Sequence, residues 1–509
     1  MRIGLAQIGS ITGDLEGNVD RCVVAAQTAA AGNAELIVLP AMAVPGLMPR
    51  DILLDPSFIE AVGKATADLA RRTRNLGPII VGTIVPSGRV VPGHPGLLRV
   101  AVVLDKGEVT AVVGQQNLAS KDVFFDTRWF VPGGASEPLD IAGRKVGVML
   151  DNDLLADNAE TPAAHLVGRS ADLLICLAAS PYRRGVNSLR VDRASATGIP
   201  TLFVNACAAA DELIFDGGSF ICRRGGALSV QLAHCREEIR VIDCDRGVGG
   251  AIQDRVWEDE VWEALKLGVR AFVDGNNLDR VVLGLSGGID SALAAVLACE
   301  SLGADKITAI AIPSRFTDEH STTSARQLAE TLGMSFEVIE LGSLHRAAES
   351  VLGALVEEGA GAENVQARLR MLIMTAWVNK NGGLLLNTSN KTELSLGYGT
   401  LHGDLAGSLS PLGDLTKPEV YQLARWVNRT GDVIPSFILD RPPTAELKEN
   451  QVDPFDYERL APALEALVQG NQSNEAMRRS EHKRQHHGVI LKVSAKAFGS
   501  GRIIPITRR

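Results

Sequence analysis

Short apolar segments alternate with amphipathic segments along the whole of this chain, and this alternation limits the fold more than any other feature. In the first half, runs rich in Val, Ile and Leu have the length of buried strands. These expected strands cover residues 3–9, 34–40, 78–84, 99–105, 145–150, 171–180, 200–206 and 218–224. Residues 19–31 and 58–73 have helical periodicity instead. Strands that alternate with helices predict a layered α/β fold.

A second α/β unit begins near residue 256. We expect a helix over 257–276, and then a strand over 280–285 that runs into a glycine-rich turn and a further helix. Later strands are expected at 306–313, 335–341 and 382–389. A chain of 509 residues is long enough for two domains of roughly 250 residues each. The sequence therefore predicts a domain at 1–245, a linker at 246–255 and a domain at 256–509.

The composition excludes several classes of function. Lys and Arg number 51 against 60 Asp and Glu, and this acidic excess of −9 is unlike a protein that coats nucleic acid. The longest apolar stretches, such as 173–180, are much shorter than the roughly 20 residues of a membrane helix. The seven cysteines show no spacing typical of a zinc site or a disulfide scaffold. We therefore expect a cytoplasmic protein that binds neither nucleic acid nor membranes.

The most specific local motif is the stretch GLSGGIDS at 284–291, which joins an expected strand to an expected helix. Paired glycines allow backbone N–H groups to approach an anion, and the helix N-terminus favours negative charge. Ser286 and Ser291 could donate to phosphate oxygens, and Asp290 could hold a magnesium ion against them. The spacing is neither that of a Walker A loop nor GxGxxG. The alternative is a simple glycine-rich turn with a serine cap.

This motif resembles the pyrophosphate loop of the ATP-pyrophosphatase superfamily, whose members form adenylates from ATP. The following segments resemble, in order, those of the NAD synthetase family. They are IPSRFTDEHS (312–321), ENVQARLR (363–370), the block 385–417 with NKTE and GD, RPPTAEL (441–447) and the tail 481–507. The resemblance covers nearly all of 256–509 and implies an ATP-pyrophosphatase-type (adenine nucleotide alpha hydrolase-like) domain with a parallel sheet.

The resemblance also implies roles for single residues. The ATP phosphates are expected to contact Ser286, Gly287, Gly288, Asp290, Ser291, Lys417 and Thr444, with Thr388 beside the ATP and with Lys417 and Thr444 on mobile loops. Deamido-NAD is expected to contact Asn364, Glu393, Asp404 and Lys483. Asp290 and Glu393 are expected to hold Mg²⁺, a hard cation that suits carboxylate ligands. Catalysis is then expected to depend on Asp290, Glu393, Asp404 and Lys417.

The implied reaction is the ATP-dependent amidation of deamido-NAD to NAD. A free carboxylate must be activated before ammonia can form an amide with it. The nicotinate carboxylate would attack the α-phosphate of ATP, and pyrophosphate would leave. Ammonia would then attack the adenylate and release AMP. The protein's part in such a reaction is positioning and charge stabilisation rather than covalent catalysis.

The first half resembles the nitrilase-type glutaminase domain of two-domain NAD synthetases, which implies an α-β-β-α sandwich. The resemblance lies in AQIGSITGDLEGNVD (6–20), SPYRRG (180–185) and DELIFDGGSF (211–220). In that domain a Cys attacks the glutamine amide, a Glu transfers protons and a Lys stabilises the oxyanion. This chain has Asp151 at the Cys position, Ala41 at the Glu position and Gln115 at the Lys position. Asp is a poor nucleophile toward an amide, so we expect an inactive glutaminase domain.

The expected enzyme is therefore an ammonia-dependent NAD synthetase that forms at least a homodimer. Three alternatives remain open at this point. A separate glutaminase or a residual internal passage could still supply ammonia. The second half could instead be another adenylating amide ligase with a different acid substrate. The first domain could serve as a scaffold or as a small-molecule sensor.

Overall fold

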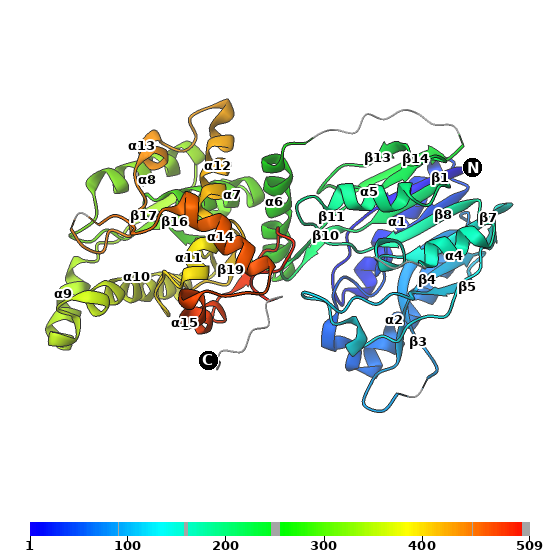
Figure 1. Cartoon of the computed structure of the whole chain (residues 1–509), viewed down its shortest axis with the longest axis horizontal. Coiled ribbons are helices and arrows are strands. Elements are labelled where there is room, and N and C mark those ends of the chain that lie inside the picture. The colour runs from blue at the N-terminus through cyan, green and yellow to red at the C-terminus, as the bar shows by residue number, and fades with distance from the viewer. Residues whose placement is uncertain (90, 157–160, 246–254, 450, 501–509) are drawn as a thin grey trace. The chain divides into compact units, whose positions relative to one another are not determined.

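The computed structural model of this protein describes residues 1–89, 91–156, 161–245, 255–449 and 451–500 (Figure 1). It divides into two compact units, Met1–Val256 and Trp257–Arg509. The expected linker at 246–255 lies outside the described residues apart from Arg255. No helix in the described ranges is long and apolar enough to cross a membrane.

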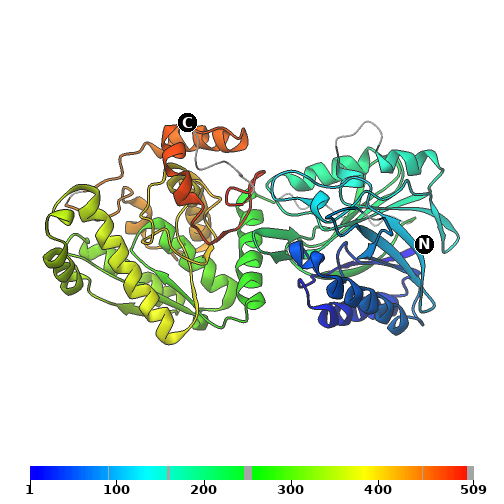
Figure 2. The ribbon, with the colours of Figure 1, turned by 90° about the horizontal axis from the view of Figure 1, so that it is seen from below.

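Two six-stranded sheets form the middle of the N-terminal unit (Figure 2). The first has the order β14 (Glu238–Asp243), β1 (Arg2–Gln7), β2 (Leu36–Val38), β3 (Ile79–Pro86), β4 (Leu97–Asp105) and β5 (Glu108–Gly114). The second has the order β13 (Leu228–Gln231), β12 (Phe220–Cys222), β9 (Thr201–Asn205), β8 (Leu173–Ala178), β7 (Arg144–Leu150) and β6 (Leu139–Ile141). A hairpin of β10 (Cys207–Ala210) and β11 (Leu213–Asp216) stands apart from both sheets.

Alternation along the strands explains why these sheets pack face to face. Ile3, Leu5 and Val38 of the first sheet share one buried cluster with Val148 and Ile175 of the second. The alternate residues of the second sheet point to its other face and pack against helices α4 (Pro162–Gly168) and α5 (Val186–Ser195). Helices α1 (Leu15–Ala31) and α2 (Pro56–Arg72) lie along the first sheet. The layers are therefore α-β-β-α, which confirms the expected sandwich.

The C-terminal unit contains a four-stranded parallel sheet of order β17 (Ser335–Val338), β16 (Ile307–Ala311), β15 (Val281–Gly284) and β18 (Leu384–Leu385). Helix α10 (Gly359–Asn381) covers one face, where Met374 packs against Val282 and Ile310. Helix α7 (Ile289–Leu302) contacts β15 and β16, and it packs between the sheet and helix α6 (Trp257–Gly275). The parallel sheet confirms the expected fold class of this half.

Shorter helices and a two-stranded pair complete the C-terminal unit. They are α8 (Glu319–Leu332), α9 (Gly342–Leu352), α11 (Lys391–Leu396), α12 (Lys417–Val427), α13 (Ser436–Asp440), α14 (Tyr457–Gln469), α15 (Glu475–Arg484), β19 (Leu409–Ser410) and β20 (Val489–Ile490). Buried Lys391 connects three of these segments, because its Nζ lies 3.0 Å from Asp414 and 2.6 Å from Glu465. Helix α11, the loop before α12 and helix α14 are thereby held together.

Candidate active site

A cavity of about 540 Å³ opens in the C-terminal unit where the parallel strands end. Its walls include Gly284 at the end of β15, Ala311 at the end of β16 and Leu385 at the end of β18. Ligands of parallel α/β sheets bind at this edge, outside the carboxyl ends of the strands. Of the site residues expected from the sequence, the cavity is lined by Ser286, Gly288, Asp290, Ser291, Asn364, Thr388, Glu393, Asp404, Lys417, Thr444 and Lys483. The structure therefore brings together residues that lie up to about two hundred positions apart.

The glycine-rich turn after β15 begins helix α7 at the cavity wall. Gly287 has a φ of +81°, and a Cβ at this residue would lie 2.4 Å from the backbone oxygen of Ser321. Only glycine fits that backbone conformation and that close approach. The hydroxyl groups of Ser286 and Ser291 lie 3.2 Å apart, and the N–H of Gly288 donates to Ser286 Oγ at 3.2 Å. These bonds hold the turn in a fixed shape with the N-terminus of α7 facing the cavity.

Two carboxylates and one ammonium group meet beside this turn. Lys417 Nζ lies 2.5 Å from Asp290 Oδ2 and 3.2 Å from Glu393 Oε1. Asn390 donates from Nδ2 to the other oxygen of Asp290, Oδ1, at 2.8 Å. Asp290 lies in the first turn of α7, Glu393 in the first turn of α11 and Lys417 at the start of α12. Three helix starts therefore place one cluster of charge at the cavity wall.

The cluster shifts the ionisation of its members. Burial raises the pKa of Glu393 to about 7, with a further increase from Asp290, although Lys417 opposes it. Burial lowers the pKa of Lys417, but the nearby carboxylates of Asp290 and Glu393 outweigh it and hold this pKa above its usual value. The ammonium of Lys417 is therefore charged at neutral pH and available to stabilise negative charge. Lys417 itself is buried as the first residue of α12, so it does not project from a loop as the sequence led us to expect.

The donor set fits magnesium only in part. Asp290 and Glu393 converge on the same ammonium atom, so their oxygens are close enough to face one small cation. Magnesium is typically held by one or two carboxylates together with substrate phosphates and water. Within the part of the chain that the structure describes, no group of three or more His, Cys, Asp or Glu side chains could hold a metal. A Mg²⁺ ion at this pair would thus need oxygens from a bound nucleotide.

Another part of the cavity wall carries residues expected to contact deamido-NAD. Asn364 of α10 accepts a hydrogen bond from Thr400 Oγ1 at 2.7 Å, and the N–H of Thr400 donates to Asp404 Oδ1 at 2.8 Å. Lys483 of α15 donates to the carbonyl groups of Gly397 and Gly399 at 2.9 and 2.8 Å. These contacts fix the turn 397–404 between α10 and α15. Glu393 lies nearer to the phosphate-loop side, beside Lys417.

Thr444 lies in a segment that is fastened to the start of α8. Glu446 Oε1 accepts hydrogen bonds from Ser321 Oγ and from Arg441 Nη2, both at 2.8 Å. Sequence reasoning missed Arg441 and Glu446, although both occur in the quoted motif 441–447. It also missed Asn390, for which a signal existed, since Asn three residues before Glu is typical of a helix N-cap.

In the N-terminal unit, two of the positions expected for a glutaminase meet around an arginine that sequence reasoning missed. Arg99 of β4 is buried, and its Nη1 lies 3.3 Å from Gln115 Oε1 and 3.6 Å from Asp151 Oδ2. Its Nη2 lies 3.5 Å from Asp126 Oδ1. Ala41 is fully buried in the apolar layer between the two sheets. A buried ion cluster therefore surrounds Asp151, the residue that the sequence comparison placed at the expected cysteine position.

Asp151 has a strained backbone, and its carboxylate accepts a backbone hydrogen bond. Its φ of 30° lies in the left-handed region, which is unfavourable for a residue with a Cβ. The N–H of Ala179 donates to Asp151 Oδ1 at 2.7 Å. Burial raises the pKa of Asp151 to about 6, while Arg99 lowers it. The turn after β7 thus presents a buried carboxylate to the backbone N–H of Ala179.

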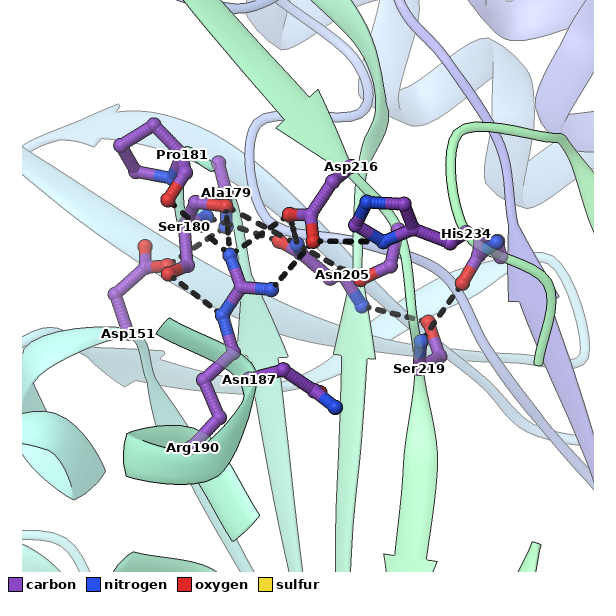
Figure 3. Close-up of polar contacts among 12 residues, drawn as sticks. Asp151, Ala179, Ser180, Pro181, Asn187, Arg190, Asn205, Asp216, Ser219 and His234 are labelled. Atoms are coloured by element: carbon purple, nitrogen blue, oxygen red, sulfur yellow. Dashed lines mark hydrogen bonds and ion pairs between the residues drawn. The ribbon is translucent and has the colours of Figure 1, made fainter. Parts of the chain in front are cut away.

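Behind Asp151, a buried arginine orders the loop that supplies this N–H (Figure 3). Arg190 donates from Nη2 to the carbonyl of Ser180 at 2.7 Å and forms an ion pair with Asp216 at 2.9 Å. His234 Nδ1 lies 3.2 Å from Asp216 Oδ2. Despite complete burial, the charges of Arg190 and His234 hold the pKa of Asp216 at about 2. A buried network of charged groups therefore holds the loop beside Asp151.

Both halves of this chain are similar to known protein families. The family model described as NAD synthase matches residues 261–497, and the one described as carbon-nitrogen hydrolase matches residues 2–254. The glutamine-dependent NAD(+) synthetase of Synechocystis sp. is 34% identical over 548 residues, which cover 99% of this chain and 98% of the relative. This chain belongs to the two-domain NAD(+) synthetase family. The enzyme of that name from Rhodobacter capsulatus is 36% identical over 501 residues, covering 93% of this chain and 89% of the relative.

A solved structure of the same family agrees with both units. The glutamine-dependent NAD+ synthetase of Acinetobacter baumannii, determined in complex with adenosine diphosphate, superposes with a TM-score of 0.80 at 26% identity. The match covers 99% of this chain and 98% of that chain. Membership in the NAD(+) synthetase family, which the motifs of 256–509 predicted, is thus confirmed, as is the nitrilase-like fold of the first unit.

Proposed function

We propose that this chain is an NAD synthetase that amidates deamido-NAD with free ammonia. Family membership supports the synthetase reaction, and the cavity of the C-terminal unit supplies the groups that the reaction needs. The claim of ammonia dependence rests on one observation. Asp151, Gln115 and Ala41 replace the three reacting groups of the glutaminase, and Arg99 pairs with two of them. We assign the synthetase to 256–509 and the inactive glutaminase domain to 1–245.

The proposed roles follow from the charge at the cavity wall. The turn 286–291 and the N-terminus of α7 would bind the phosphates of ATP, with Thr388 and Thr444 beside them. Lys417 would stabilise the charge that develops on the leaving pyrophosphate. Asp290 and Glu393 would hold Mg²⁺, which supplies charge neutralisation at the phosphates when it is bound. Asn364, Asp404 and Lys483 would orient the nicotinate end of deamido-NAD for attack on the α-phosphate.

The experiment for this reaction follows the oxygen of the nicotinate carboxylate. The purified chain is incubated with MgATP, ammonium chloride and deamido-NAD that carries ¹⁸O in its carboxylate. An adenylate intermediate transfers one ¹⁸O atom to the phosphate of AMP, and NAD, AMP and pyrophosphate form in equal amounts. Formation of ADP and phosphate, or of AMP without ¹⁸O, would contradict the adenylate route.

Glutamine dependence is the competing assignment, because the relatives from Synechocystis and Rhodobacter carry that name. The nitrogen donor in those names is that of the relatives. For this chain, the donor must be argued from its own residues at 41, 115 and 151. Asp151 offers a carboxylate paired with Arg99 in place of a thiolate nucleophile, and Ala41 offers no carboxylate to act as the base of a glutaminase. A comparison of the two nitrogen donors decides between the assignments.

The proposed assembly is a homo-oligomer that forms through the C-terminal unit. Val351 of α9 is 84% exposed, Leu355 of the short turn after α9 is 75% exposed and Leu372 of α10 is 54% exposed. Large apolar side chains that are this exposed are candidates for a contact surface. The proposed occupant is a second copy of this chain. We also propose a cytoplasmic location, since Cys22, Cys176 and Cys207 are buried thiols of the kind that a reducing compartment preserves.

A further inference from the structure

Asn390 lies at the point where the phosphate-loop side of the cavity meets helix α11. It follows β18 by a short turn and is the N-cap residue of α11. Its side chain is completely buried, although asparagine usually prefers the surface. A buried amide is stable only when its donors and acceptors are paired. The contacts of this amide therefore indicate what it does.

Asn390 forms hydrogen bonds to both residues proposed to hold Mg²⁺, from its side chain to Asp290 and from its side chain and backbone to Glu393. Its Nδ2 donates to Asp290 Oδ1 at 2.8 Å. Its Oδ1 accepts the N–H of Glu393 at 3.1 Å, and its own backbone N–H donates to Glu393 Oε2 at 3.3 Å. The remaining oxygens, Asp290 Oδ2 and Glu393 Oε1, both face Lys417 Nζ. Asn390 thus turns one oxygen of each carboxylate toward the same point.

We infer that Asn390 is the positioning residue that sets the distance between Asp290 and Glu393 and thereby the divalent-cation affinity of the site. This inference rests on the proposed function, because it takes these two carboxylates as the metal pair. Asp290 and Glu393 belong to different helices and repel each other, so their separation needs a link that is not itself acidic. Asn390 makes that link by hydrogen bonds, while Lys417 offsets the charge.

The substitutions separate this role from simple helix capping. Ser replaces Asn as an N-cap at little cost, so Asn390→Ser keeps an acceptor for the N–H of Glu393. Its short hydroxyl removes the amide that donates to Asp290. Asn390→Ala removes both contacts. Asn474→Ser is the matched control, since Asn474 caps α15 by accepting the N–H of Met477 at 2.9 Å.

The measurement is the binding of Mn²⁺, a paramagnetic substitute for Mg²⁺, to the full chain at saturating ATP without deamido-NAD, so that no turnover occurs. Electron paramagnetic resonance distinguishes enzyme-bound Mn²⁺ from the Mn–ATP complex in solution. We expect Asn390→Ser and Asn390→Ala to weaken Mn²⁺ binding equally, by about tenfold or more, and Asn474→Ser to bind as the wild type does. The kcat of Asn390→Ser should recover at high Mg²⁺ concentration.

Two results would overturn the inference. One is wild-type Mn²⁺ binding by Asn390→Ser together with weak binding by Asn390→Ala, which would mean that Asn390 only caps α11. The other is unchanged Mn²⁺ binding by both variants. If either variant fails to fold, Asn390→Gly replaces it, because glycine is also tolerated as an N-cap. Failure of the wild type to form NAD would instead refute the proposed function, and the Mn²⁺ result would be judged separately.

Discussion

Arg99 accounts for the most unusual chemistry in the N-terminal unit. Its guanidinium faces Gln115, Asp126 and Asp151. The guanidinium carbon also lies 5.3 Å from the centre of the Phe130 ring. A buried carboxylate without a cation is strongly unfavourable, so the Asp at position 151 depends on this arginine. The guanidinium of Arg99 is therefore the cation that allows two carboxylates, Asp126 and Asp151, to be buried together in this unit.

Removal of Arg99 should destabilise the N-terminal unit. In Arg99→Met, the buried carboxylates of Asp151 and Asp126 lose their cation. We expect the free energy of unfolding of this unit to fall by about 3 kcal/mol. Adding Asp151→Asn to Arg99→Met should recover part of it. The control is Arg128→Met, which breaks an exposed ion pair with Asp51 and should cost about 1 kcal/mol or less. Urea-dependent hydrogen exchange of peptides from β4 and β7 measures these differences, and equal effects of the two single variants would contradict the account.

The raised pKa of Asp151 predicts a pH dependence of stability. Between its ordinary value near 3.8 and about 6, the native protein keeps a proton that the unfolded chain has lost. The contribution of Asp151 to the free energy of unfolding is therefore largest below about pH 4, and it is lost as the pH rises to about 6. In the wild type, the free energy of exchange protection in β7 should fall by about 3 kcal/mol across this window because of Asp151, and Asp151→Asn should remove this fall. The control is Asp192→Asn, a substitution at an exposed position, which should leave the pH profile unchanged. The same slope in both variants would be evidence against this role.

At the scale of elements, the turn from β15 to α7 was the part of the site most accessible to sequence reasoning. Its residues are contiguous, so the glycines, the serines and Asp290 could be recognised together. The rest of the cluster carries no such local signal. Glu393 and Lys417 were expected only from the family resemblance, and Asn390 was missed, because all three come from other helix starts. Their meeting with Asp290 depends on how α7, α11 and α12 pack, which no local pattern encodes.

Substitution of Gly287 tests the geometry of this turn. Gly287→Ala places a methyl group against the backbone of Ser321 and at a positive φ, so the turn or the start of α8 must shift. We expect the Kd for ATP to rise by about tenfold or more while the fold remains. Gly275→Ala is the control, because a Cβ there meets nothing within 4 Å. Isothermal titration with ATP gives the answer, and unchanged affinity of Gly287→Ala would exclude the proposed phosphate site.

The expected strands were found mainly where apolar runs are fully buried, as in β1, β7, β8 and β9. Strand β5 was not expected, since its first residues are exposed at the edge of the sheet. Strand β18 has two residues, far fewer than the expected 382–389, because the chain turns away to line the cavity. Periodicity thus identifies buried strands, but it does not report edges or the strands' spatial order.

For the whole molecule, the exposed apolar side chains of Val351, Leu355 and Leu372 predict self-association. Leu355→Glu and Leu372→Glu together place charge in a surface that a second copy would bury, and we expect them to shift the chain toward the monomer. Val24→Glu is the control, since Val24 is 59% exposed on α1 of the other unit. Light scattering after size-exclusion chromatography reports the mass. A monomeric wild type, or a double variant with an unchanged oligomeric mass, would contradict this assignment.

The source of nitrogen is the central claim for the whole molecule, and a comparison of two donors tests it most directly. NAD formation is measured with ammonium chloride and with glutamine at equal concentration, and glutamate release is followed in parallel. Asp151→Ala reports any contaminating glutaminase, because activity from another protein persists in it. We predict rapid NAD formation with ammonium, and with glutamine neither NAD nor glutamate above that background. Glutamine-driven turnover that matches the ammonium rate and disappears in Asp151→Ala would contradict the account.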